Sequence, residues 1–472
     1  MSQDWDDITQ RVRYVADPQR IARMRQFPYS TRNALLGLIL LKKFFEIDPD
    51  GSADWHEIET ATSDICDLLN TAVHRIEQKN PELQGWLDGI DYNNTLLRKA
   101  PMREAFWKDV IAQFSGIELS CRDPKKSWNW NDICLLIHDY WFRSAIPEFG
   151  YIETPESISQ LETELISPPD GFSIYDPFST NGTSLVVAAK TARSKDLRLF
   201  AETGTKEQAL SARLNFLMTD HPDSSVVVSN VIRKPGFIEG PHKLMTFQRI
   251  IGTLPTNNEY RGVDVAEDDP YSRFGYGIPP TTAGEFTYLQ HCLASLTKDG
   301  MMAIAVPPSV LFKQRSEGRI RMGIIKDDLV EAVILLPKKV YQFHAINYAI
   351  LVINRNKVPE RKTKVIFIDA SNDSWHHGTF QRTLTPTDPD KIVTAFRDFV
   401  DIEGYCRVCS IDEVEENKYL LDVGRYVKPK RAIVPKVDLR VSLTKLELAH
   451  RMQVNEYERV RIKAEEIIEY LG

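Results

Sequence analysis

Short apolar runs alternate with amphipathic stretches through the central part of the chain, between residues 148 and 430. The apolar runs that predict β-strands cover residues 172–175, 197–201, 225–229, 247–252, 301–306, 330–335 and 347–353. Apolar positions at helical spacing predict helices over residues 205–218, 284–296 and 316–326. Because strands that alternate with helices form mainly parallel sheets covered on both faces, this part is expected to be an α/β domain.

The first 147 residues carry a different pattern, which predicts helices. Leucine and isoleucine fill most positions from Leu35 to Leu41, and a second apolar series from Ile65 to Ile76 recurs at helical spacing. The segment Pro147–Pro155 contains proline and glycine, which interrupt regular structure. We therefore predict a helical N-terminal domain over residues 1–147 and an α/β domain over residues 148–430.

The C-terminal segment, residues 431–472, predicts a helical tail. From about Lys436 onward, charged residues are interspersed with leucines such as Leu439, Leu443 and Leu446. A charged amphipathic helix at a chain end packs on a partner, on a second copy or on its own domain. Because these leucines exceed what a short helix needs on one face, we expect the tail to join a partner or a second copy.

The stretch Phe172–Leu185 reads F-S-I-Y-D-P-F-S-T-N-G-T-S-L and predicts a strand, a tight turn and a helix. Asp176 ends the apolar run, and Gly182 is the one glycine of the turn. Ligands of open α/β sheets bind at the carboxyl ends of the strands, where glycine lets the backbone approach them closely. The stretch is therefore a candidate cofactor loop, and the alternative is an ordinary connection from strand to helix.

Acidic and amide side chains follow the next two predicted strands. Glu202 stands about twenty residues beyond Gly182, where an acidic residue commonly accepts hydrogen bonds from ribose hydroxyls. A solvated glutamate at a strand end is the alternative. Asn230, after the third strand, is assigned to the same candidate cofactor site. The chain lacks G-x-G-x-x-G, which weakens a nicotinamide or flavin cofactor, and it lacks G-x-x-x-x-G-K-[ST], which argues against a nucleoside triphosphatase.

Composition narrows the class of protein. With 472 residues, 42% of them hydrophobic, the chain has the length of two or three globular domains. Its net charge of -7 means that any nucleic acid must meet a local basic patch or a partner subunit. Six scattered cysteines indicate reduced thiols in the cytoplasm, and the lone pair Cys406-x-x-Cys409 predicts no metal site. The longest apolar run, Ala34–Leu41, is too short to span a membrane.

Several motifs occur in a recognisable order. The most specific covers residues 271–321, from Y-S-R-F-G-Y-G-I-P-P through V-P-P-S-V-L-F to S-E-G-R-I-R. The helix R-N-A-L-L-G-L-I-L-L-K-K-F-F-E and Asn80-Pro81-Glu82-Leu83 precede it, and V-I-L-L-P, K-V-I-F-I-D-A and R-Y-V follow. Over residues 30–430 the chain resembles the modification subunits of type I restriction-modification systems, which are adenine-N6 DNA methyltransferases. The resemblance implies a Rossmann-like S-adenosylmethionine-dependent methyltransferase sheet after a helical N-terminal domain.

The resemblance places the catalytic residues directly after the fourth strand. There the family carries Asn or Asp, then Pro, Pro and an aromatic, which hold the adenine amine and stack on the flipped base. This chain carries Thr253, Leu254, Pro255 and Thr256 instead. Thr253 lacks the amide carbonyl, Leu254 replaces a proline, and Thr256 cannot stack on a base. We therefore expect impaired methyl transfer; the alternative is an active enzyme that uses the carbonyl of Leu254 and the amide of Asn257 or Asn258.

The cofactor motifs of the family also carry substitutions. The Asp-Pro-x-x-Gly-x-Gly loop appears as Asp176–Gly182 with Thr180 at the first glycine, and a β-branched residue resists positive φ and close approach to a ligand. Ahead of Thr154-Pro155, Glu153 replaces an aromatic. S-adenosylmethionine is thus expected to bind weakly or not at all. The residues assigned to any pocket that remains are Thr154, Asp176, Gly182, Glu202 and Asn230.

Our leading hypothesis is a cytoplasmic subunit that associates with double-stranded DNA in a restriction or phage-defence assembly without modifying it. Its expected partners are a specificity-subunit-like protein or another defence protein, and a second copy of the chain. The first rival is a functioning adenine-N6 methyltransferase. The second rival is a scaffold that holds only proteins and has lost both DNA and cofactor.

Overall fold

The computed structural model describes most of the chain up to residue 428. The described ranges are 3–17, 29–48, 51–94, 100–115, 153–192, 196–255, 268–280, 284–341, 346–372, 375–377, 381–383 and 388–428, with single positions in 133–137 and 443–463. Met1–Lys428 form one compact unit and Pro429–Gly472 a second. The described positions of the second unit are helical, and the rest of the predicted tail helix lies outside the described residues.

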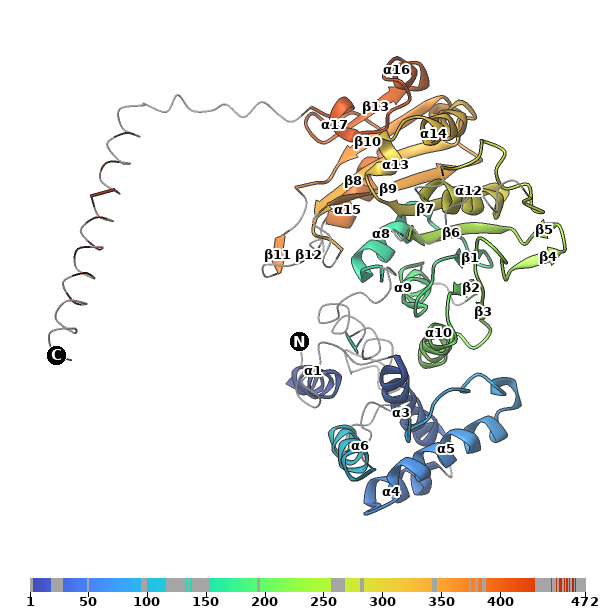
Figure 1. Ribbon diagram of the computed structural model, residues 1–472, viewed down its shortest axis with the longest axis vertical. Coiled ribbons are helices and arrows are strands. Elements are labelled where there is room, and N and C mark those ends of the chain that lie inside the picture. Colours follow the sequence, from blue (N-terminus) through green and yellow to red (C-terminus); the bar gives the residue numbers. More distant parts are fainter. Residues whose placement is uncertain are drawn as a thin grey trace. The chain divides into compact units, whose positions relative to one another are not determined.

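The described part of residues 1–147 contains helices and no strand. The elements are α1 (Gln3–Ala16), α3 (Tyr29–Ile47), α4 (Gly51–Thr60), α5 (Ile65–Lys79), the 3-10 turn η1 (Pro81–Leu83) and α6 (Ala100–Phe114). Figure 1 shows these helices. Their buried apolar side chains form one core that includes Leu36, Leu69 and Trp107. Residue 147 lies outside the described residues, so the domain boundary there stays a prediction.

Helix α3 packs against helix α10 (Lys206–Met218), and polar contacts fix the pair. The ammonium of Lys43 donates to the carbonyls of Leu217 (3.2 Å) and Met218 (3.0 Å) and pairs with Asp220 (2.7 Å). These carbonyls belong to the last turn of α10, where a cation also offsets the negative end of the helix dipole. The buried lysine therefore caps α10 from the neighbouring helix.

A nine-stranded sheet forms the centre of the α/β part. Its strands are β1 (Ser173–Asp176), β2 (Arg198–Thr203), β3 (Ser225–Val228), β6 (Phe247–Thr253), β7 (Leu296–Val306), β8 (Val330–Lys338), β9 (Asn347–Asn354), β10 (Lys364–Asp369) and β13 (Cys406–Ser410). Their order is β13-β10-β8-β9-β7-β6-β1-β2-β3. Strand β9 runs antiparallel to both of its neighbours and β13 to β10, whereas the other neighbours are parallel. The predicted α/β sheet, mostly parallel, is confirmed.

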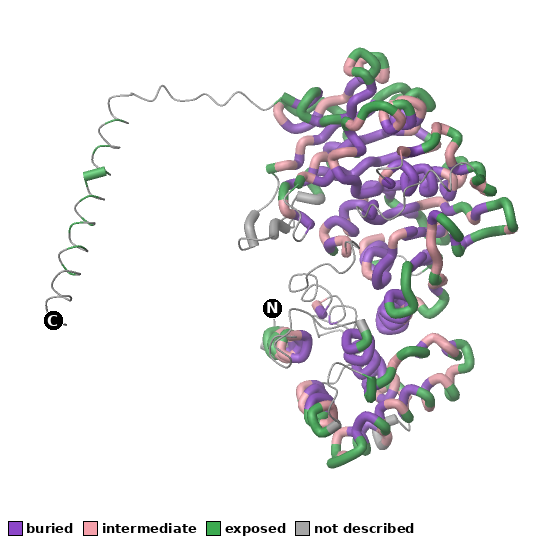
Figure 2. Tube along the Cα trace, viewed as in Figure 1, coloured by how far each residue is buried: buried purple, intermediate pink, exposed green. Residues whose placement is uncertain are grey.

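Helices cover both faces of this sheet. On one face lie α8 (Glu156–Ile166), α9 (Thr183–Ala192), α10 and α15 (Asp388–Asp398). On the other lie α12 (Glu285–Ala294), α13 (Ser309–Phe312), α14 (Ser316–Lys326), α16 (Ile411–Glu416) and α17 (Val423–Tyr426). Successive strand residues such as Ile174 and Tyr175 enter the two cores in turn, as the two-residue period of a strand requires. Figure 2 shows the resulting continuous band of buried strands.

Four short strands form two separate two-stranded sheets. Strand β4 (Ile238–Gly240) pairs with β5 (Lys243–Leu244), and β11 (Trp375–His377) pairs with β12 (Gln381–Thr383). Cys406 and Cys409 lie on β13 and enter the cores on opposite faces of the sheet. Their thiols therefore do not converge on one point. Among the described residues, no helix is long and apolar enough to cross a membrane.

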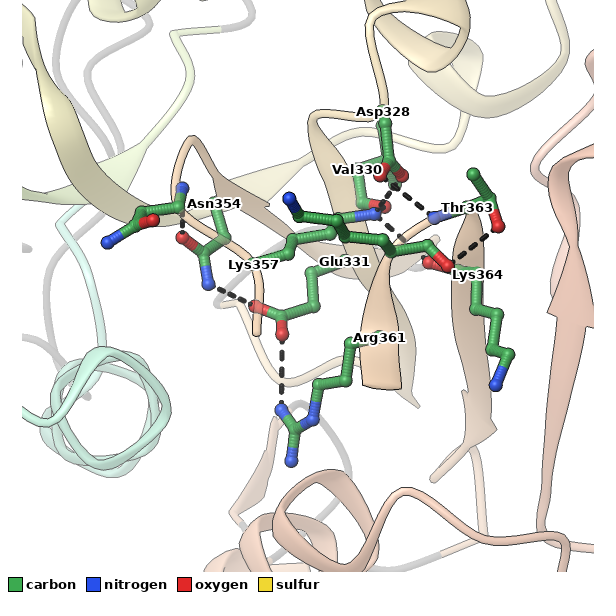
Figure 3. A network of polar contacts seen from close by, with 10 residues as sticks. Asp328, Val330, Glu331, Asn354, Lys357, Arg361, Thr363 and Lys364 are labelled. Carbon is green, nitrogen blue, oxygen red and sulfur yellow. Dashed lines mark hydrogen bonds and ion pairs between the residues drawn. The ribbon is translucent and has the colours of Figure 1, made fainter. Parts of the chain in front are cut away.

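A polar network ties β8, β9 and β10 together near the start of β8 (Figure 3). The buried ammonium of Lys357 donates to the Asp328 carboxylate (2.6 Å) and to the carbonyls of Val330 (2.6 Å) and Lys364 (3.0 Å). Beside it, Glu331 accepts from Arg361 (3.1 Å). All three protons of the lysine are thus used inside the protein, which is the condition for burying a charge at tolerable cost.

Candidate functional site

The carboxyl ends of four parallel strands, β6, β1, β2 and β3, meet at one edge of the sheet. A cavity of about 130 Å³ opens there. Its walls are formed by Pro177, Phe178, Ser179, Glu202, Thr203, Gly204, Ser229, Asn230, Val231, Pro255 and Tyr288. Every wall residue except Tyr288 lies within three residues of the carboxyl end of one of these strands, so the strand register decides which side chains come together.

Asp176 ends β1 and lies almost wholly buried beside this cavity. Its Oδ1 accepts a hydrogen bond from the Phe178 amide (3.0 Å). Strand β6 passes close by at Gly252, whose φ is 136°, and a Cβ at that position would stand 2.8 Å from Asp176 Oδ1. Burial raises the pKa of Asp176 to about 7, and the donors at Phe178 and Ser179 offset part of the increase. Asp176 can therefore hold or release a proton near neutral pH.

The turn after β1 is closed by its own hydrogen bonds. Ser179 Oγ accepts from the Gly182 amide (3.1 Å), and Gly182 adopts φ 74°. A Cβ on Gly182 would lie 3.2 Å from Ala212 and Phe216, so this glycine serves the packing of α9 on α10 rather than the cavity wall. Thr180 has no positive φ and does not line the cavity. The backbone of Thr180 is therefore in an ordinary conformation, and the expected effect of its side chain on cofactor binding stays a prediction.

Glu202 lines the cavity and is held by three internal donors. Its carboxylate accepts from the hydroxyls of Tyr175 and Ser229 and from the Gly236 amide (2.8 Å). Burial raises the pKa of Glu202, and these donors offset part of that increase. A carboxylate offers about four acceptor positions, so one remains for a ligand hydroxyl.

Asn230 lines the cavity but directs its side chain into its own turn. Its Oδ1 accepts from the amides of Ile232 (3.2 Å) and Arg233 (2.9 Å). This geometry is an Asx turn, which fixes the backbone beyond β3. Asn230 therefore shapes the wall more than it offers a free acceptor.

Thr253, the first residue of the predicted catalytic motif, ends β6 in a chain of three hydroxyls. Its Oγ1 lies 2.9 Å from Thr154 Oγ1 and 2.8 Å from the Tyr341 hydroxyl. Thr253 is 5% exposed. The hydroxyl of Thr154, a residue that the sequence assigns to the cofactor, therefore contacts Thr253; its role toward a cofactor stays a prediction.

The other three residues of the predicted motif separate from one another. The side chain of Leu254 is fully buried in the apolar core, and its amide donates to the Ala305 carbonyl (2.9 Å). Pro255 lines the cavity. Thr256 lies outside the described residues. The structure therefore brings Glu202, Asn230 and Pro255 together around the cavity, with Asp176 beside them.

A second buried acid, Glu162 on α8, lies near Asp176. No described residue makes a well-formed hydrogen bond to either of its carboxyl oxygens, although the backbone of Gly252 and of Ala305 is close. Burial raises the pKa of Glu162 strongly, and Asp176 raises it further. Burial and the nearby Asp176 carboxylate therefore both favour the protonated form of Glu162.

Sequence reasoning missed the aromatic and basic groups behind the cavity. Tyr175 reads as an ordinary apolar strand position, and His291 as part of a buried helix face. Arg273 lies within the Y-S-R-F-G-Y-G segment, which was noted as a motif without a role. These three residues are far apart in sequence, so only the fold reveals that they meet. Among the described residues, no group of three histidine, cysteine or acidic side chains could hold a metal ion.

The chain is similar to known proteins both in its sequence and in its fold. The family model described as N-6 DNA Methylase matches residues 139–433. The type I restriction enzyme MjaVIII methylase subunit of Methanocaldococcus jannaschii is 26% identical over 438 residues, which cover 88% of this chain and 72% of that protein. The HindI methylase subunit of Haemophilus influenzae is 26% identical over 397 residues, covering 77% of this chain and 83% of that protein.

Among solved structures, a type I restriction-modification methyltransferase subunit from Streptococcus thermophilus aligns with a TM-score of 0.73 at 19% identity. The alignment covers 90% of this chain and 99% of that one. At this level of identity, the likeness shows the fold alone. The predicted Rossmann-like fold of S-adenosylmethionine-dependent methyltransferases is confirmed.

Proposed function

Because this chain belongs to the N-6 DNA methylase family, we propose that it is a modification-type subunit that associates with DNA in a restriction assembly and is impaired in methyl transfer. The similarity to type I methylase subunits confirms the resemblance expected from the motifs. This similarity does not extend to three properties that we propose for the chain: impaired methyl transfer, binding of DNA and membership of a restriction assembly.

The observation that carries the proposal is the state of residues 253 and 254. Adenine-N6 transfer needs acceptors that hold the exocyclic amine in line with the methyl donor. The Thr253 hydroxyl is engaged with Thr154 and Tyr341, and Leu254 is buried in the core. The Leu254 side chain has no polar atom, and the buried Thr253 hydroxyl is already bonded to two other hydroxyls, which supports impaired transfer.

The residues around the cavity fit the nucleoside part of S-adenosylmethionine, with a reduced donor and acceptor set. S-adenosylmethionine, when bound, supplies an activated methyl group. Glu202 would accept one ribose hydroxyl, and Phe178 and Tyr288 would contact the base. The cavity of about 130 Å³ is smaller than typical ligand pockets of roughly 300–1,000 Å³. S-adenosylmethionine is therefore expected to bind with an affinity weaker than the low micromolar range. The reason is the small volume of the cavity rather than the side chain of Thr180.

The rival function is an active adenine-N6 methyltransferase. The specific observation in its favour is that the cavity persists at the carboxyl ends of the strands, with Glu202 and Pro255 in its walls. Its acceptors would be the carbonyl of Leu254 and the amide of Asn257 or Asn258; the last two lie outside the described residues. This rival function predicts methyl transfer by the native chain that is lost when Leu254 or Pro255 is changed.

The proposed partners are double-stranded DNA, a specificity-subunit-like or other defence protein, and a second copy of the chain, all in the cytoplasm. Support comes from a fold neighbour in a structure of type I restriction-modification complex assembly, which aligns with a TM-score of 0.63 at 14% identity. The alignment covers 100% of this chain and 99% of that one. With a net charge of -7, DNA must be met by local cations or through a partner.

Salt-dependent DNA binding tests this association. The full chain, alone and with its co-encoded partner proteins, would be titrated with duplex DNA between 50 and 200 mM salt, a range that changes affinity by roughly 10³–10⁵-fold for 6–10 phosphate contacts. The proposal predicts binding that weakens with salt. Absence of binding under all these conditions would favour the scaffold rival.

A further inference from the structure

We propose that Arg273 is a positioning residue of the cavity, acting on Glu202 through His291 and Tyr175 and holding the cavity wall at residues 231–232. The inference rests on the proposed function, because it takes the cavity to receive a nucleoside with a ribose diol. It assigns a role to the Y-S-R-F-G-Y-G segment, which contributes no residue to the cavity wall.

Arg273 is a buried cation with every side of its guanidinium engaged. It pairs with the buried carboxylate of Asp269 through Nε (2.9 Å) and Nη2 (2.7 Å). The rings of Tyr271 and Phe274 stack near it, with centroids 5.4 and 5.3 Å from its Cζ. Arginine keeps its charge when buried and holds a fixed fork of donors, so its position constrains each group that it contacts.

Two further hydrogen bonds of Arg273 hold the loop after β3, which forms part of the cavity wall. Arg273 Nη1 donates to the Val231 carbonyl (3.2 Å), and Nη2 donates to the Ile232 carbonyl (2.8 Å). Val231 lines the cavity and follows Asn230, whose Asx turn holds the same segment. The loop after β3 is therefore clamped from its carbonyl side by Arg273 and from its amide side by Asn230.

A third contact determines the tautomer of His291. Arg273 Nη1 lies 3.3 Å from His291 Nδ1, and a guanidinium can only donate. Nδ1 must therefore accept, and the neutral ring carries its proton on Nε2. Burial and the charge of Arg273 lower the pKa of His291 to about 3, which agrees with a neutral ring. The histidine has one arrangement available in the folded protein.

That arrangement sets the direction of the next two hydrogen bonds. His291 Nε2 lies 3.3 Å from the Tyr175 hydroxyl, so its N–H points at the phenolic oxygen. The hydroxyl hydrogen is then directed to Glu202. With Ser229 and Gly236 also donating, each described partner of Glu202 is a donor, an arrangement that favours the ionised form of its carboxyl group. The buried chain thus fixes the orientation of the Glu202 carboxyl group at the cavity wall.

The test compares Arg273→Met with Arg321→Met. Arg321 is also buried and donates to the carbonyls of Tyr419, Val310 and Lys313, but it has no contact with the cavity wall, so it is a matched control. The ring nitrogens of His291 are followed by ¹⁵N NMR from pH 5 to 8 without ligand, with His291→Gln used for assignment. We expect a single Nε2–H tautomer that does not titrate in the native chain and in Arg321→Met, and a tautomer mixture or a titration in Arg273→Met.

S-adenosylmethionine in excess, measured by calorimetry, gives the second readout. Arg273→Met is expected to bind it roughly tenfold more weakly than Arg321→Met. If Arg273→Met does not fold, His291→Leu replaces it, with His291→Gln as the conservative variant that keeps an N–H near Tyr175. An Nδ1–H tautomer in the native chain, or equal affinity in all variants including no binding by any, would overturn the inference. Methyl transfer by the native chain would overturn the proposed function and leave the NMR result standing.

Discussion

Asp176 is the residue of the candidate site whose protonation governs stability near neutral pH. Its pKa is about 7 in the folded protein and about 3.8 when exposed. Between these values the folded state holds a proton that the unfolded state has released. The contribution of Asp176 is therefore fully present below about pH 4 and is lost as the pH rises to about 7, by an amount on the order of 4 kcal/mol at most.

Asp176→Asn removes this titration and keeps an oxygen for the Phe178 amide. We expect the variant to show a smaller decrease in the free energy of unfolding between pH 4 and pH 7 than the native chain. Urea denaturation at several pH values measures both slopes. Parallel slopes in the two proteins would mean that Asp176 ionises normally in the folded state.

Lys357 supports the sheet through charge rather than through apolar packing. Lys357→Met removes the cation beside Asp328, which keeps only the Thr363 amide as a donor, and removes a donor from two carbonyls, so we expect the free energy of unfolding to fall by about 3 kcal/mol. The matched control is Lys79→Met, because Lys79 pairs with Asp48 at 2.6 Å while 47% of its side chain is exposed. That change should cost less than about 1 kcal/mol. Equal losses in chemical denaturation would contradict the importance of burial.

At the scale of elements, the turn from β1 to α9 depends on the backbone of Gly182. Gly182→Ala forces a side chain into φ 74° and brings its Cβ to 3.2 Å from Ala212 and Phe216. We expect a loss of roughly 1–2 kcal/mol in the free energy of unfolding. Gly424→Ala in α17 meets open space and should be neutral or slightly stabilising. A neutral Gly182→Ala in thermal denaturation would show that the turn relaxes.

Strands and helices with continuous apolar patterns could be predicted from the sequence, and the predicted central strands and helices are found. The short hairpins and β13 were not predicted, because polar and charged residues interrupt their apolar positions and leave no continuous apolar run. The antiparallel insertion of β9 between β7 and β8 depends on tertiary packing, which local patterns do not encode. The sequence singles out Glu202 and Asp176 because each stands at the end of an apolar run, whereas Arg273 and His291 carry no such positional signal.

At the scale of the whole molecule, the C-terminal unit is expected to serve assembly. Deleting residues 436–472 removes most of this unit, Pro429–Gly472, and leaves Met1–Lys428 intact. We expect the truncated chain to keep its thermal transition and to form a smaller assembly, because the leucines of the tail lose their partner. Light scattering measures the mass of both proteins. An assembly with the same number of chains would count against a role of the tail in association.

The central claim, impaired methyl transfer, is tested most directly by transfer of labelled methyl from S-adenosylmethionine to adenine in duplex DNA. The proteins compared are the native chain, alone and with its partner proteins, and a variant carrying Thr253→Asn, Leu254→Pro and Thr256→Phe. Alignment of the amine contributes roughly 7–11 kcal/mol and base stacking roughly 1–3 kcal/mol, so their loss leaves little rate above background. The account predicts no incorporation by the native chain and a measurable gain in the variant. Incorporation by the native chain that is abolished by changing Leu254 or Pro255 would contradict it.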